Sequence, residues 1–169
     1  MRKRQHVNVN ALCFETFSGE MPRLEPGRVV ELEIGCADAQ FLFERAAKDP
    51  SRTYIGLEIR ESLVNEVNKR AEAENLPVQA VWVHASLHLS DLLPPQSVRH
   101  CFLNFPDPWF KRKHRDRRMI NESLLRQLHP ILEESGDVLM QSDVFDVALD
   151  AMDMFERCDD IYENFVGPW

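Results

Sequence analysis

The residues best suited to chemistry stand together in one short segment. Residues 104–110 read Asn-Phe-Pro-Asp-Pro-Trp-Phe, and residues 111–118 read Lys-Arg-Lys-His-Arg-Asp-Arg-Arg. Asp107 is therefore a carboxylate between two prolines, which restrict the backbone, beside an aromatic ring and at the mouth of a cationic run. A carboxylate, a ring that can stack on a base and a patch that attracts phosphate together indicate a site that modifies nucleic acid.

The cationic run is local. The whole chain has 20 Lys and Arg against 28 Asp and Glu, a formal charge of −8, whereas residues 111–118 hold six basic residues and one acidic residue, a net +5. Such a patch can dock phosphate while the rest of the protein stays acidic. Runs of like charge are usually only solvated, so it is the adjoining Pro-Asp-Pro-Trp segment that favours a nucleic-acid site.

Composition excludes several other classes of protein. The chain has 169 residues and 44% hydrophobic residues, enough for one globular core. Its basic N-terminus lacks the apolar stretch of a signal peptide, and no run could span a membrane, so we expect a cytoplasmic protein without membrane association. The six histidines are dispersed and the cysteines show no paired spacing, so we expect reduced thiols and no metal site; the cysteines are Cys13, Cys36, Cys101 and Cys158.

Short β-branched runs alternate with helical patterns along the chain, which predicts an α/β sheet of parallel strands. Residues 1–28 are predicted to be an N-terminal extension and residues 29–169 to be one domain. The predicted strands cover residues 29–35, 53–59, 78–84, 98–104, 137–142 and 161–166, and the predicted helices cover residues 40–48, 61–74, 120–133 and 144–157.

The ends of the first two strands carry a second possible site. Gly35 permits a tight turn after the first strand, and Glu33 lies two residues before it. Glu58 ends the second strand and either accepts the hydroxyl groups of a ribose or is simply solvated. Ala37 and Ala39 stand where a dinucleotide site would carry further glycines, so an oxidoreductase is the least expected function.

These features resemble the bacterial tRNA (guanine-N7)-methyltransferases, class I enzymes that use S-adenosylmethionine. The resemblance covers residues 29–155, and residues 104–118 are its most specific part. It implies a Rossmann-like open, mostly parallel sheet with helices on both faces, and it makes residues 29–169 the methyltransferase domain. Because the chain ends at Trp169, we expect the last strand of that fold to be absent. The exposed sheet edge would then suit a second subunit, and so a homodimer.

The resemblance also implies roles for individual residues. Asp107 matches the catalytic aspartate of the family and also lies near the cofactor, and Lys111 and Asp143 match its substrate-binding residues. Ala85 falls where the family has an acid or an amide on the adenine side. The implied cofactor residues are Glu33, Gly35, Glu58, Ala85 and Asp107, and the implied tRNA-binding residues are Lys111, Arg112, Arg115, Arg118 and Asp143.

The implied reaction suits these residue types. Guanine N7 has a lone pair in the ring plane, so methyl transfer needs placement and exclusion of water but no general base. The methylated ring is cationic, and Asp107 would either stabilise that charge or hold the edge of the base by hydrogen bonds. Trp109 either stacks on a base or the adenine, or it packs in the core under the loop.

A second hypothesis is a catalytically weak or inactive relative that binds RNA or a protein partner through the cationic run. Ala37 and Ala39 put side chains where the family is usually rich in glycine, and Ala85 lacks the polar group of the family. Affinity for S-adenosylmethionine distinguishes the two hypotheses, because a purely structural protein has no use for the cofactor.

Overall fold

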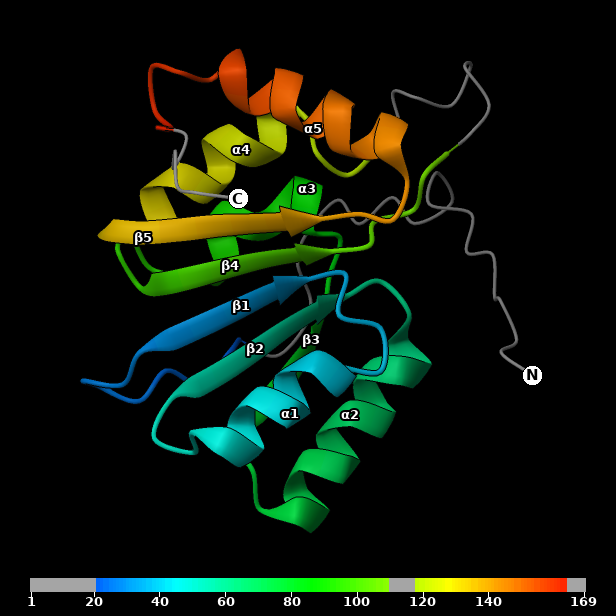
Figure 1. Cartoon of the computed structure of the whole chain (residues 1–169). Helices are drawn as coiled ribbons and strands as arrows, with labels where there is room; N and C mark the ends of the chain where they lie inside the picture. The colour runs from blue at the N-terminus through cyan, green and yellow to red at the C-terminus, as the bar shows by residue number, and fades with distance from the viewer. Residues whose placement is uncertain (1–20, 110–117, 164–169) are drawn as a thin grey trace.

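The structure, a computed structural model, describes residues 21–109 and 118–163 (Figure 1). Its strands are β1 (Val30–Ile34), β2 (Thr53–Glu58), β3 (Val78–Trp82), β4 (Val98–Asn104) and β5 (Leu132–Gln141). Its helices are α1 (Gln40–Lys48), α2 (Glu61–Glu74), α3 (Ala85–Leu92), α4 (Glu122–Leu128), the 3-10 turn η3 (His129–Ile131) and α5 (Phe145–Glu156).

The strands form one parallel sheet in the order β3-β2-β1-β4-β5. The chain therefore builds outward from β1 to β3 and then returns to place β4 on the other side of β1. In sheets of this kind ligands bind outside the carboxyl ends of the strands, at the point where the order reverses. The predicted α/β sheet of parallel strands is confirmed, and its reversal point lies between β1 and β4.

Helices cover both faces of the sheet (Figure 1). On one face, α1 and α2 bury residues such as Phe43 and Val67 against the sheet. On the other face, α3, α4 and α5 bury residues such as Leu89, Leu124 and Ala151. Strands buried on both faces are expected to be apolar along their whole length, and β1 and β2 are fully buried.

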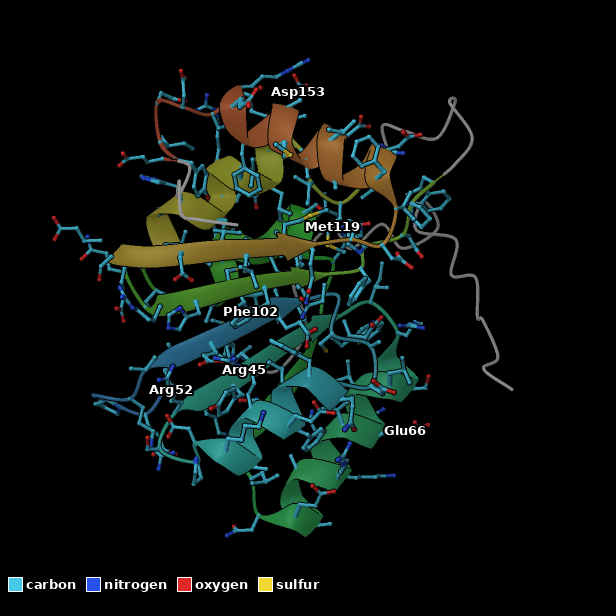
Figure 2. All side chains as sticks on the ribbon, in the orientation of Figure 1. Arg45, Arg52, Glu66, Phe102, Met119 and Asp153 are labelled. Atoms are coloured by element: carbon cyan, nitrogen blue, oxygen red, sulfur yellow. The ribbon has the colours of Figure 1, made fainter. Side chains whose placement is uncertain are left out.

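Two buried carboxyl groups interrupt the apolar sequence of β1, and arginines hold the first of them. Glu31 is fully buried, and it accepts hydrogen bonds from Arg45 of α1 and from Arg52, the latter at 2.7 Å. The Arg45 guanidinium also lies 4.9 Å from the centre of the Phe102 ring, and Figure 2 shows both arginines reaching toward the sheet. A buried carboxylate is tolerated only with such partners, so this cluster fixes α1 on β1.

One helix of the structure was not predicted, and three predicted elements differ from the structure. Helix α3 was not predicted, because its eight residues follow β3 without a recognisable cap. The predicted helix 120–133 ends at Leu128, and β5 begins five residues earlier than expected, at Leu132. The pairing of β5 with β4 shifts register beside Gly136. A Cβ at this position would lie 2.9 Å from the Glu133 carbonyl oxygen, so the lack of a side chain lets β5 continue through the shift from Leu132. The predicted strand 161–166 is wrong for residues 161–163, and residues 164–166 lie outside the described residues.

The described part of the predicted N-terminal extension contacts the sheet. Leu24 packs against the core, and the Arg23 backbone amide donates to Gln79 Oε1 at 2.8 Å. The division into an extension and a domain stays a prediction. Among the described residues, no helix has the length and apolar character needed to cross a bilayer.

Candidate active site

The predicted site residues of four strands meet at the carboxyl edge of the sheet. Glu33 lies near the end of β1, and Glu58 ends β2. Asp107 follows β4 by three residues, and Asp143 follows β5 by two. The strand pairing brings β1 between β2 and β4, with Glu33 opposite both Gly56 and Phe102. These four carboxylates therefore follow or lie near the ends of adjacent strands at the same edge of the sheet.

The turn after β1 keeps the backbone path of a glycine-rich loop. Gly35 has φ 79°, and its amide donates to the Leu57 carbonyl at 2.8 Å. Ala37 and Ala39 both have φ 53°, in the left-handed region where an L-residue is strained by about 1–2 kcal/mol. The two alanines thus add methyl groups to this turn and leave its backbone in the conformation that glycine favours.

Glu58 is buried and fully hydrogen-bonded. Its Oε1 accepts from the backbone amide and the Nε of Arg60, each at 2.9 Å. Its Oε2 accepts from the Ala37 amide at 3.0 Å and from Arg60 Nη2 at 2.9 Å. A carboxylate has about four acceptor positions, so a ribose can bind Glu58 only by displacing the Arg60 side chain. The sequence did not lead us to expect a role for Arg60, although its place two residues after Glu58 allows it to pair with that carboxylate.

Glu33 is buried but only half satisfied. Its Oε1 accepts from Asn104 Nδ2 at 2.8 Å, and its Oε2 has no hydrogen-bond partner among the described residues. Burial raises the pKa of Glu33 to about 7, an effect that the Asn104 hydrogen bond opposes and the charge of Asp38 adds to. A buried carboxylate with one vacant oxygen attracts a cationic ligand group.

Asn104 links β1 and β5, the strands that neighbour β4, at the carboxyl edge of the sheet. It is the last residue of β4, it pairs in register with Gln141 of β5, and its Oδ1 accepts from Gln141 Nε2 at 2.7 Å. Sequence reasoning included Asn104 in its motif without giving it a role and did not consider Gln141. The signal for Asn104 was its place as the polar end of a buried strand.

The loop after β4 holds Asp107 at the surface of this edge. Phe105 and Trp109 have φ values of 48° and 42°, and the Phe105 amide donates to the Gln141 carbonyl at 2.9 Å. Asp107 is exposed, and its charge helps to raise the pKa of Arg60, after the larger effect of the Glu58 hydrogen bond. Arg60 therefore binds one carboxylate, Glu58, and also feels the charge of a second, Asp107. Trp109 is half-buried, and the choice between stacking and core packing stays open.

Arg118 holds the other end of that loop. Its Nε donates to the Pro108 carbonyl at 3.1 Å, and its Nη1 contacts Asp150 and the Asp146 carbonyl of α5. Its side chain is only 10% exposed. Arg118 was predicted to bind tRNA, and in the structure it ties the Asp107 loop to α5. Lys111, Arg112 and Arg115 lie outside the described residues.

Ala85 begins α3, three residues after the end of β3, and so lies at the same edge of the sheet. The residue before it, His84, has a buried Nδ1 without a hydrogen-bond partner, and burial lowers the pKa of that histidine. Asp143 is exposed. Among the described residues, no three His, Cys, Asp or Glu side chains are grouped as ligands of a metal would be.

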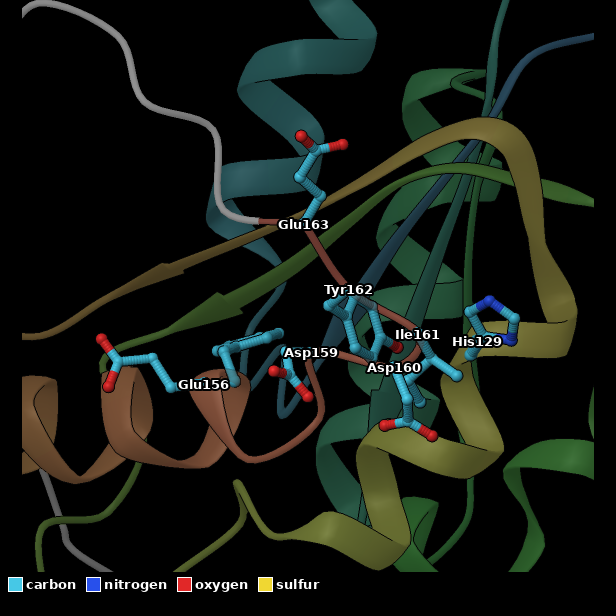
Figure 3. Close-up of a pocket in the computed structure, with 8 residues that line it drawn as sticks. His129, Glu156, Asp159, Asp160, Ile161, Tyr162 and Glu163 are labelled. Carbon is cyan, nitrogen blue, oxygen red and sulfur yellow. The ribbon is translucent and has the colours of Figure 1, made fainter.

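Two hollows in the described part of the chain bear on the location of the site. One, of about 10 Å³, is lined by Pro106 and Asp107 among others and has room for at most a water. The other, of about 690 Å³, lies at the C-terminal end of α5 (Figure 3). Its acidic lining does not suit a phosphate ligand, and none of the predicted site residues belongs to it; it includes His129, Glu156, Asp159, Asp160, Tyr162 and Glu163.

Comparison with known proteins identifies the family. A family model described as "Putative methyltransferase" matches residues 27–165. A tRNA (guanine-N7)-methyltransferase of Thermosynechococcus vestitus is 37% identical over 92% of this chain and 75% of its own length. One of a Nostoc species is 33% identical over 100% of this chain and 81% of its own. The chain belongs to the tRNA (guanine-N7)-methyltransferase family.

Solved structures confirm the fold of this methyltransferase-family chain. A SAM-dependent methyltransferase of Aquifex aeolicus superposes with a TM-score of 0.56 at 13% identity, over 75% of this chain and 71% of that protein. The precorrin-6y C5,15-methyltransferase of Geobacter metallireducens gives 0.58 at 17% identity, over 78% and 62%. At these identities the likeness shows the Rossmann-like fold alone.

The residues at the edge fit S-adenosylmethionine, the cofactor of this family. The vacant buried oxygen of Glu33 suits a cationic group, and the cofactor carries an ammonium and a sulfonium. The turn at Gly35 has little room for a side chain, because a Cβ there would lie 3.1 Å from Met119 Cε. Glu58 offers the acceptors that ribose hydroxyls need once Arg60 moves.

Proposed function

We propose that this chain transfers the methyl group of S-adenosylmethionine to N7 of a guanine in tRNA. The observation that carries the proposal is the meeting of Glu33, Glu58 and the Asp107 loop at one sheet edge, in a chain whose curated relatives bear that activity in their name.

The reaction asks little covalent chemistry of the protein. The cofactor supplies an electrophilic methyl group on a sulfonium, and guanine N7 attacks with a lone pair that is already available. The protein has to align the two partners and keep water out. Asp107 is the one acidic side chain of residues 105–109, and we assign it to the guanine, either as a counter-charge to the cationic product or as an acceptor for the edge of the base.

The cofactor residues of the proposal are those of the edge. We assign the cationic end of the cofactor to Glu33, the tight turn beside it to Gly35, and the ribose to Glu58. Ala85, at the start of α3, would lie against the adenine side by its backbone and methyl group, since it has no polar side-chain atom. Asp107 would contact both the cofactor and the base.

We assign tRNA binding to the surface around the Asp107 loop. Lys111, Arg112 and Arg115 would hold phosphates, which makes the affinity for tRNA fall as salt rises. Asp143 is exposed and follows β5 by two residues at the same edge of the sheet, where it would contact the substrate nucleoside. Arg118 joins this set as the residue that connects the loop to α5.

Two finer proposals concern the surroundings of the enzyme. Unmodified tRNA is a cytoplasmic substrate, and we therefore propose that the enzyme is located in the cytoplasm. The outer edge of β5 has no strand partner among the described residues, and a second copy of the chain is our proposal for what covers it. Sedimentation of the full chain at two concentrations tests the second proposal, because a dimer dissociates on dilution.

The experiment is transfer of labelled methyl from S-adenosylmethionine to an unmodified tRNA transcript, read out by strand cleavage specific for N7-methylguanine. Wild type is compared with Asp107→Ala and with Asp153→Ala, an exposed aspartate of α5 paired with Arg157. We expect transfer by wild type and by Asp153→Ala and at least a hundredfold loss in Asp107→Ala, on the order of the effect of a positioned catalytic group. Equal transfer by all three removes Asp107 from the reaction.

The second hypothesis, an inactive relative that binds RNA or a protein, has lost part of its basis. Ala37 and Ala39 were grounds for it, and both hold the backbone that a glycine-rich turn would have. Ala85 remains the one departure with a missing polar group. Absence of cofactor binding by the folded chain would restore this hypothesis.

A further inference from the structure

A chain of hydrogen bonds crosses three adjacent strands at the carboxyl edge. Gln141, the last residue of β5, donates from Nε2 to Asn104 Oδ1 at 2.7 Å. Asn104, the last residue of β4, donates from Nδ2 to Glu33 Oε1 on β1 at 2.8 Å. Asn104 and Gln141 are register partners, so the two amides are held side by side by the sheet itself.

The direction of this chain is fixed by the chemistry of its ends. When Glu33 is ionised its carboxylate only accepts hydrogen bonds, so Asn104 then has to turn its NH2 group toward Glu33 and its carbonyl oxygen toward β5, as the structure has it. Gln141 then has to donate. The opposite rotation of the Asn104 amide would bring its carbonyl oxygen against the Glu33 carboxylate, and the donated bond from Gln141 disfavours that rotation.

Glu33 has little else to stabilise its charge. The Asn104 bond is the one hydrogen bond to its carboxylate among the described residues, and Oε2 is buried without a partner. The ionisable groups around it are of little help: Cys36 is a buried thiol, and Asp38 repels the charge. The orientation of one amide therefore decides how well Glu33 can carry a negative charge.

We propose that Gln141 is a positioning residue for cofactor binding, which acts by orienting the Asn104 amide so that it donates to Glu33. Gln141 does not itself contact the cofactor. The proposal rests on the proposed function only through the assignment of Glu33 to the cofactor. It adds to the site a residue on β5, two residues before the predicted Asp143, that no motif of the sequence contains.

The hydrogen-bonding ability of residue 141 can be varied at nearly constant size. Gln141→Met removes donor and acceptor, Gln141→Glu leaves only acceptors, and Gln141→Lys leaves only donors. Leu139→Glu is the control for added charge, because Leu139 is 52% exposed on the same strand and points to the same side as residue 141. The probe is S-adenosylhomocysteine, and its dissociation constant is measured by calorimetry on the full chain.

We expect about threefold to tenfold weaker binding in Gln141→Met, the usual effect of one lost hydrogen bond, and weaker binding still in Gln141→Glu. Gln141→Lys should restore most of what Gln141→Met loses, and Leu139→Glu should bind as wild type does. In a Glu33→Gln background the residue-141 changes should have no further effect, because they act through Glu33.

Affinities that are equal across the three variants, or an effect that persists in Glu33→Gln, overturn the proposal. Failure of the proposed function itself looks different. In that case wild type binds S-adenosylhomocysteine no better than Glu33→Gln does, or it binds the probe and transfers no methyl to tRNA.

Discussion

Replacing Glu33 by glutamine should make the protein more stable at neutral pH. Glu33 is 4% exposed, one of its oxygens has no hydrogen-bond partner, and burial raises its pKa to about 7 from an ordinary value of 4.5. A buried charge of this kind opposes folding. Glutamine has the shape of the protonated acid and can still accept from Asn104, so it removes the charge with little change in packing.

The size and sign of the effect follow from proton linkage. Between pH 4.5 and pH 7 the folded protein keeps a proton on Glu33 that the unfolded chain has lost, so the free energy of unfolding falls as the pH rises through this window. A pKa change from 4.5 to about 7 corresponds to about 3 kcal/mol at most. Below pH 4.5 wild type and Glu33→Gln should be equally stable, and above pH 7 the variant should be more stable by up to that amount.

Urea unfolding of both proteins at several pH values from 4 to 8 measures this directly. Glu66→Gln, an exposed glutamate of α2 (Figure 2), controls for the loss of one charge, and its difference from wild type should stay within about 0.5 kcal/mol throughout. A constant difference between wild type and Glu33→Gln across the whole range would refute the reasoning. The same substitution should weaken binding of S-adenosylhomocysteine, since it removes the charge that we assign to the cofactor.

Two further predictions concern arginines of the site. Arg60→Met should tighten S-adenosylhomocysteine binding by about threefold to tenfold, because the ribose then no longer has to displace the Arg60 side chain from Glu58. Weaker binding, measured by calorimetry, would instead indicate that Arg60 itself contacts the cofactor. Arg118→Lys and Asp150→Asn should each lower kcat by about tenfold and leave the KM for tRNA unchanged, because the first loses the Nε–H that donates to the Pro108 carbonyl and the second weakens the contact of Arg118 with α5. A raised KM in Arg118→Lys alone would identify Arg118 as a phosphate ligand.

Much of the fold could be predicted because its signals are local. Helix α1 and helix α2 were predicted with their observed bounds, since each has an apolar stripe and a clear end, at Asp49-Pro50 for α1 and at Asn75 for α2. Strand β4 was also predicted with its observed bounds. The alternation of strands and helices was enough to predict a parallel sheet and the edge at which its ligand binds.

The misses have non-local causes. Helix α3 is short and gains its stability from packing on α4, through Leu89 and Leu92 in the shared core. The early start of β5 depends on its pairing with β4 beside Gly136. Hydrogen bonds between residues far apart in the sequence could not be predicted either. The register of β4 and β5 sets the partner of Asn104 on β5, and the placement of α5 sets its contact with Arg118.

The measurement that tests the central claim most directly changes one atom of the substrate. Two tRNA transcripts are prepared, one with guanosine and one with 7-deazaguanosine, in which a C–H group replaces N7, and both are offered with labelled S-adenosylmethionine. We predict methyl transfer to the guanosine transcript and none to the 7-deaza transcript, with similar affinity for both because the phosphates are unchanged. Equal labelling of the two transcripts would contradict transfer to guanine N7, and no labelling of either would contradict methyl transfer to tRNA by this chain.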